Sequence, residues 1–212
     1  SEGDYEGGEP NRNHIFRNNT VSNYGYGFLL GSNERGEGEY GHIVENNTIS
    51  GCRTEGIGVK CGDSRVRSNT ISGGATSIAV RAGAGSVVEN NRITGADCGI
   101  RIFGRGHTVH NNCIVRCPVA AIHVARTTDV REDPAENVFI EHNSCIDCAQ
   151  NSGGDAAIMV DASTTSIIRR NLFFGCPAPW VADTALDGQS LLTFENGMDH
   201  LTTALKGCER ID

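Results

Sequence analysis

An asparagine recurs at a nearly regular interval along this 212-residue chain, each time at the end of a short run of alternating apolar and polar residues. The seven positions are Asn19, Asn47, Asn69, Asn91, Asn112, Asn143 and Asn171. Their separations are 28, 22, 22, 21, 31 and 28 residues, which is a period near 22 interrupted by insertions. Such a period predicts a solenoid, in which each repeat forms one coil and equivalent residues stack from coil to coil.

The repeats are rich in β-branched residues and carry Asn and Gly between short alternating runs, which indicates strands joined by tight turns. Parallel strands need a crossover connection, and here the other strands of the same coil provide it. The sequence therefore predicts an all-β fold, a right-handed parallel β-helix of about seven coils, with rungs about 4.8 Å apart.

Aligning the repeats on the asparagines predicts which residues share a column. One apolar column is Val44, Val66, Val88, Val109, Ile140 and Ile168, and a second is Ile57, Ile78, Ile100, Ile122 and Ile158. An outward column of alternating charge is Arg17, Glu45, Arg67, Glu89, His110, Glu141 and Arg169. We expect the apolar columns to form the core, the asparagines an amide ladder, and the charged column a solvated ion ladder.

Three segments follow from where the repeat begins and ends. Residues 1–10 are polar and Gly-rich and are expected to form a flexible tail, residues 11–183 the β-helix domain, and residues 184–212 a capping segment. Within the last segment, residues 198–207 have the pattern of a short amphipathic helix. Because the tail is too polar to cover a core, the open N-terminal rung predicts a missing domain or a partner chain.

Composition narrows the classes of partner. The net charge of −8 argues against nucleic acid, and no apolar stretch reaches membrane-spanning length. The nine cysteines are an odd number, so at least one is unpaired within the chain. The alignment places Cys52, Cys117, Cys148 and Cys176 in one turn column, where we expect them to pack as small apolar residues, with a disulfide between adjacent rungs as the alternative.

One outward face departs from the pattern of alternating charge. Lys60 and Arg81 fall in the same column one coil apart, where like charges about 5 Å apart repel by about 1 kcal/mol in water. Arg101 in the next coil extends this positive stripe, and small residues flank it. A stripe of this kind suits a polyanion, although two solvated cations that splay apart would give the same pattern. A lysine whose pKa is lowered by a neighbouring arginine can act as a base.

The stretch from Asn23 to Asn112 resembles the β-helical polysaccharide lyases of family six, which include alginate lyases and chondroitinase-B-like enzymes. The shared features are Glu55 five residues before Lys60, Arg81-Ala82-Gly83 one coil later, and an upstream Asn23. The resemblance implies Lys60 as the catalytic base, Arg81 as the acid or carboxylate partner, and Asn23 with Glu55 as the remains of a calcium site. It also implies an extracellular or periplasmic location.

Two positions depart from the family pattern. Arg53 stands where the family has the first Glu of Glu-x-Glu, which removes a calcium ligand and offers a cation that could neutralise a substrate carboxylate directly. Ala82 stands where the family has His.

The leading hypothesis is a lyase that cleaves an anionic, uronate-containing polysaccharide, alginate-like in the first instance, by β-elimination. It uses Lys60 and Arg81 as catalytic residues, with carboxylate-binding subsites at Arg53, Arg101, Arg105 and His123. The alternative is a non-catalytic β-helix that binds carbohydrate or assembles with other subunits. Glycoside hydrolysis is disfavoured because it needs two or three convergent carboxylates, and this face offers Asp161 and Glu55. Insertions at residues 31–41 and 126–136 are expected to flank the groove as loops.

Overall fold

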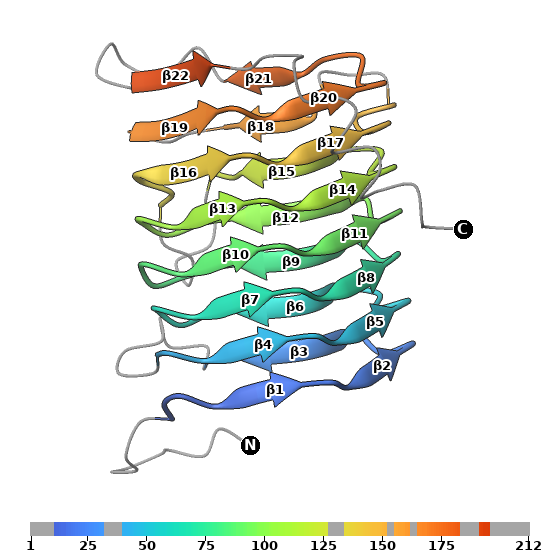
Figure 1. Cartoon of the computed structure of the whole chain (residues 1–212), viewed down its shortest axis with the longest axis vertical. Helices are drawn as coiled ribbons and strands as arrows, with labels where there is room; N and C mark the ends of the chain where they lie inside the picture. Colours follow the sequence, from blue (N-terminus) through green and yellow to red (C-terminus); the bar gives the residue numbers. More distant parts are fainter. Residues whose placement is uncertain are drawn as a thin grey trace.

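The computed structural model describes residues 11–31, 40–126, 134–151, 155–161, 165–182 and 191–195. In these residues the chain winds through successive coils, and each coil adds one strand to each of three parallel sheets (Figure 1). This confirms the predicted all-β solenoid. The predicted helix at residues 198–207 lies outside the described residues. No helix within the described part is long and apolar enough to cross a membrane.

The first sheet has the order β1-β4-β7-β10-β13-β16-β19-β22. Its strands are β1 (Ile15–Arg17), β4 (Ile43–Glu45), β7 (Arg65–Arg67), β10 (Val87–Glu89), β13 (Thr108–His110), β16 (Val138–Glu141), β19 (Thr165–Arg169) and β22 (Leu191–Glu195). The second sheet consists of β2 (Thr20–Ser22), β5 (Thr48–Ser50), β8 (Thr70–Ser72), β11 (Arg92–Thr94), β14 (Cys113–Val115), β17 (Ser144–Ile146) and β20 (Leu172–Phe174). The third consists of β3 (Tyr26–Leu30), β6 (Glu55–Val59), β9 (Thr76–Val80), β12 (Cys98–Ile102), β15 (Ala120–Val124), β18 (Ile158–Val160) and β21 (Trp180–Ala182).

The solenoid extends past the boundary expected at residue 183. Strand β22 pairs in parallel with β19, with Ile168 opposite Phe194, so one strand of the expected capping segment belongs to the first sheet. The sequence obscured this strand because Gly197 stands where the repeat would place the next ladder asparagine.

Strand register confirms the two predicted apolar columns. In the first sheet Val44 pairs with Val66 and Val66 with Val88, and in the third sheet Ile57 pairs with Ile78 and Ile78 with Ile100. These side chains are at most 1% exposed. The interior is therefore a stack of aliphatic side chains from all three sheets, and its burial is the main stabilising contribution to the fold.

The asparagine column forms the expected amide ladder. The Nδ2 of each asparagine donates to the Oδ1 of the next one along the chain, from Asn19 to Asn171, at 2.9 to 3.0 Å. The same Oδ1 also accepts the backbone N–H of the preceding rung's asparagine, as between Asn69 and Asn91 at 3.0 Å. The residue before each asparagine has a left-handed φ, for example 56° at Asn90, which turns the chain from the first sheet into the second.

The charged column on the first sheet is an ion ladder, as expected. Arg67 Nε donates to Glu45 Oε2 at 2.8 Å, His110 Nε2 lies 3.1 Å from Glu89 Oε2, and Arg169 Nε donates to Glu141 Oε2 at 2.8 Å. The paired side chains remain partly exposed, so each pair contributes only a few tenths of a kcal/mol.

The turn cysteines carry free thiols, as predicted from packing. Cys52, Cys117 and Cys148 are at most 2% exposed, and Cys176 is partly exposed. Seven cysteines of the described residues are free, whereas Cys113 is disulfide-bonded. Three of the turn thiols follow one another in successive coils.

Candidate functional site

The candidate site lies on the outer face of the third sheet, hereafter the third-sheet face. Pairing places Gly58, Ala79, Arg101, His123 and Met159 in one outward column. Two residues further along each coil, the register places Gly31, Lys60, Arg81, Phe103, Ala125 and Asp161 in a second one. Both columns match the alignment made from the sequence.

Lys60 and Arg81 occupy consecutive rungs at the same position. The Lys60 N–H donates to Leu30 O at 2.8 Å, and the Arg81 N–H donates to Val59 O at 2.7 Å, which continues the ladder beyond the last paired residues of β6 and β9. Rung spacing therefore places the two α-carbons about 4.8 Å apart. Both residues are half-buried.

Arg81 is held by Glu55, which corrects the expectation of an uncompensated like-charge pair. Arg81 Nε donates to Glu55 Oε1 at 2.7 Å, and a terminal guanidinium nitrogen of Arg81 donates to the same oxygen. The Glu55 side chain is 3% exposed and that of Arg81 28% exposed. A carboxylate this deeply buried needs a cationic partner, so the pair holds the Arg81 guanidinium in one position against Glu55, in the coil that also carries Lys60.

Arg101 is positioned by packing on an aromatic ring. Its guanidinium carbon lies 5.1 Å from the centroid of the Phe103 ring, within cation–π range, and Phe103 is only 2% exposed. Its Nε is buried and makes no hydrogen bond to any of the described residues. An unbonded buried donor is costly, so the Nε–H of Arg101 lowers the stability of this arrangement.

His123 and Asp161 form a second polar pair on the same face. His123 Nε2 lies 2.7 Å from Asp161 Oδ2, and the His123 side chain is only 14% exposed. Since His123 is the register partner of Arg101, this pair follows Arg101 one rung along the solenoid. A histidine oriented by a carboxylate can donate or accept a proton or bind an anion.

The structure does not bring every predicted residue into this cluster. Arg53 is exposed in the turn between β5 and β6, and Arg105 is exposed after β12. Asn23 is exposed in the turn between β2 and β3, where its Oδ1 would lie 2.7 Å from a Cβ built on Gly51. The contacts of the described residues therefore place Asn23 against a neighbouring turn and Glu55 against Arg81.

These positions do not fit a calcium ion. Calcium takes six to eight oxygen ligands. Glu55 Oε1 is taken by Arg81, and Oε2 is directed over Gly58, 2.4 Å from where a Cβ on that glycine would be. Among the described residues no group of three or more His, Cys, Asp or Glu side chains is arranged to hold a metal.

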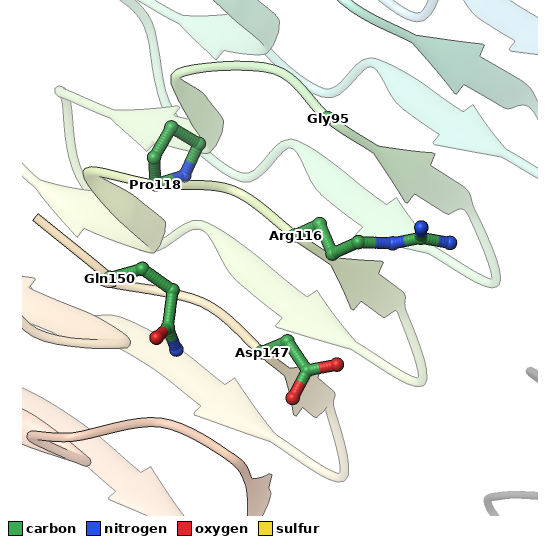
Figure 2. Close-up of a pocket in the computed structure, with 5 residues that line it drawn as sticks. All are labelled: Gly95, Arg116, Pro118, Asp147 and Gln150. Carbon is green, nitrogen blue, oxygen red and sulfur yellow. The ribbon is translucent and has the colours of Figure 1, made fainter.

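A separate depression of about 530 Å³ lies at the corner between the second and third sheets (Figure 2). It is lined by Gly95, Arg116, Pro118, Asp147 and Gln150. The Arg116 and Asp147 side chains extend outward from neighbouring coils, and Gln150 Nε2 donates to Gly175 O at 2.7 Å. None of the predicted site residues lines it, so its size does not identify it as the site predicted from sequence.

Comparison with known proteins agrees with the fold. Residues 9–173 match the sequence model of the right-handed β-helix region. A mutant tailspike protein of E. coli bacteriophage HK620, solved in complex with a pentasaccharide, has a TM-score of 0.60 at 14% identity over 87% of this chain. A mannuronic acid-specific family 6 polysaccharide lyase from human gut microbiota has a TM-score of 0.50 at 20% identity over 93% of this chain.

This chain spans 41% of the tailspike chain and 56% of the lyase chain. At these identities the likeness shows a shared fold and leaves the chemistry to the site itself. A search of curated proteins found no match.

Proposed function

We propose that this chain, which belongs to the family of right-handed β-helix proteins, is a lyase that cleaves a uronate-containing polysaccharide by β-elimination. The observation that carries the proposal is the position of Lys60, one rung from an arginine that a buried carboxylate holds in place. The resemblance to family six lyases supports the same two residues. Alginate-like polymers are the substrate class proposed first.

In the proposed reaction Lys60, in its neutral form, removes the weakly acidic proton on the ring carbon beside the substrate carboxylate. The electron pair of that C–H bond forms a carbon–carbon double bond within the ring, and the adjacent bond to the glycosidic oxygen breaks. The departing oxygen takes up a proton from water, and the protonated Lys60 afterwards returns its proton to the solvent. Arg81 lies beside Lys60, where its positive charge favours the charge that develops on the carboxylate in the transition state.

The other cations of the face would bind neighbouring sugars. Arg101 and His123 follow Arg81 on successive rungs, so a polymer running along the solenoid axis meets a cation or a histidine about every 4.8 Å. Arg53 lies in an exposed turn before β6, and Arg105 lies in an exposed turn after β12 of the same sheet. Both would contact substrate carboxylates at the edges of the third-sheet face. Arg53 would supply directly the neutralising charge that the resemblance assigns to calcium.

A non-catalytic role in glycan binding is the second candidate, and one observation favours it. Arg81 is already paired with Glu55, and Ala82 replaces the histidine of the family pattern, so fewer free groups remain for proton transfer. Either function fits our proposal of an extracellular or periplasmic protein.

The test is ultraviolet absorbance of the unsaturated uronate ends that β-elimination creates, measured on alginate, pectate and chondroitin-type polymers. We expect turnover on at least one polymer and a loss of at least about 100-fold in kcat for Lys60→Ala. Arg67→Ala removes an outward cation from the ion ladder of the first sheet and should keep the wild-type rate. Absence of turnover on all three polymers, or full activity of Lys60→Ala, overturns the lyase proposal. Binding of a polymer without product would establish the second candidate.

A further inference from the structure

Three free cysteines stack in the turn that follows the second sheet. Val115 of β14 pairs with Ile146 of β17, and Ile146 pairs with Phe174 of β20. The residues two positions further on are Cys117, Cys148 and Cys176, which therefore occupy the same position in successive coils. We call these three residues the thiol column. The lyase proposal makes no use of it.

The sulfur atoms of Cys148 and Cys176 each lie between their own coil and the preceding one. Cys148 Sγ lies 3.3 Å from Ile146 O and 3.5 Å from Ile114 O. Cys176 Sγ lies 3.5 Å from Phe174 O and 3.4 Å from Cys145 O, so both thiols reach the coil of the cysteine before them. Adjacent rungs set α-carbons about 4.8 Å apart, within the range of about 4.4 to 6.8 Å that a disulfide spans. Backbone register and sulfur direction thus both bring neighbouring thiols together.

Exposure distinguishes the members of the column. Cys117 and Cys148 are 0% exposed, whereas Cys176 is partly exposed. An oxidant in solution therefore reaches Cys176 first and would find Cys148 as the adjacent buried thiol. Cys52 occupies the same turn but has Gly74 in the next coil, so it has no thiol neighbour there and serves as an internal control.

We propose that Cys148 and Cys176 are a site of reversible oxidation, at which a peroxide joins two successive coils through a disulfide. The peroxide oxidises the Cys176 thiol to a sulfenic acid and is reduced to water or an alcohol. The Cys148 sulfur then attacks the Cys176 sulfur, the S–O bond breaks, and water leaves with the Cys148 proton. A small thiol reductant returns both residues to the free form.

The environment makes this oxidation slow near neutral pH. Hydrogen bonding with Cys117 and burial raise the pKa of the Cys148 thiol to about 12, and hydrogen bonding with Cys148 and burial raise the pKa of Cys176 as well. Because the thiolate is the reactive form, the rate of cross-linking should rise with pH.

The experiment treats the folded 212-residue chain with hydrogen peroxide, blocks the remaining thiols after denaturation, and maps tryptic peptides by mass spectrometry. We expect the peptide of residues 132–169 to become linked to that of residues 171–206, with fragment ions placing the bond at Cys148 and Cys176. Dithiothreitol should reverse the link, and the rate of linking should increase with pH. The link should also raise the thermal midpoint by restricting the unfolded chain.

Cys52→Ser is the matched control and should cross-link as the wild type does, whereas Cys176→Ser should not cross-link. The wild-type map decides the proposal even if a variant folds poorly. Oxidation of Cys176 to a sulfinic acid without a link, a link to Cys145 instead, or retention of all free thiols after prolonged exposure to peroxide would overturn it.

Discussion

Replacing Asn91 by alanine tests whether the amide ladder holds the coils in register. Asn91 is 1% exposed, and its Oδ1 accepts both the backbone N–H and the Nδ2 of Asn69, each at 3.0 Å. Its own Nδ2 donates to Val66 O at 2.9 Å and to Asn112 Oδ1 at 3.0 Å. The single substitution therefore breaks four buried hydrogen bonds across three coils.

The expected cost follows from which groups lose every partner. Asn69 keeps one side-chain bond, to Val44 O, but its backbone N–H and the other amide hydrogen lose their acceptor. Asn112 Oδ1 still accepts the backbone N–H of residue 91. Two orphaned buried donors at about 1 to 3 kcal/mol each predict a loss of about 4 kcal/mol in the free energy of unfolding.

The assay is urea denaturation followed by circular dichroism, with the stability read from the midpoint where the slope is unchanged. Asn19→Ala is the matched control, because Asn19 is exposed and its Nδ2 donates to Asn47 Oδ1 at 3.0 Å. We expect that variant to lose about 1 kcal/mol or less. Equal losses for the two variants, or a loss below about 1 kcal/mol for Asn91→Ala, would refute the ladder as a buried structural element.

Two further predictions concern ion pairs. Arg81→Ala leaves the Glu55 carboxylate buried without its partner and should destabilise the fold by about 3 kcal/mol; adding Glu55→Gln should recover most of this loss in the same urea assay. Hydrogen bonding from Arg169 lowers the pKa of Glu141 below its usual 4.5. The stabilisation that this pair gives the fold is therefore fully present above pH 4.5 and is lost as the pH falls through the pKa of Glu141 in the folded protein. Arg169→Gln should reduce the dependence of the thermal midpoint on acid pH.

The sequence predicted the columns because a solenoid repeats one set of constraints in every coil. Each ladder asparagine must sit in the same turn, and each aliphatic column must fill the same part of the interior, so a single register error would have disrupted all columns together. The pairing of Ile57 with Ile78 and of Val44 with Val66 followed from spacing alone. The strand β22 was missed because Gly197 replaces the ladder asparagine that marked the other coils.

The Glu55–Arg81 pair could not be predicted from alternation. Counting back from the buried Val59, strict alternation places Ile57 and Glu55 on the inner side. The structure departs from this at Gly56, where a Cβ would lie 2.9 Å from Ile71 Cγ2 in the core, so two consecutive residues face inward. This irregularity returns Glu55 to the outer side, beside Gly58 and within reach of Arg81. The departure from alternation at Gly56 therefore determines that the Glu55 carboxylate pairs with Arg81.

The pairing changes how the third-sheet face can attract an anionic polymer. Arg81 and Arg101 carry positive charge, as Lys60 does when it is protonated, but Glu55 lies against Arg81 and Asp161 lies against His123. The local excess of positive charge is therefore small, and the whole chain carries a net charge of −8, which repels a polyanion at long range. Long-range attraction cannot account for binding on such a face. Within the Debye length of about 10 Å the few excess positive charges of the face compete with the negative net charge of the chain, and beyond that distance salt screens both. Recognition of the proposed polymer would instead have to come from short-range bonds made by groups that are already held in place, Arg81 by Glu55 and His123 by Asp161. On this view the two carboxylates that reduce the positive charge of the face are also what orient it for a substrate.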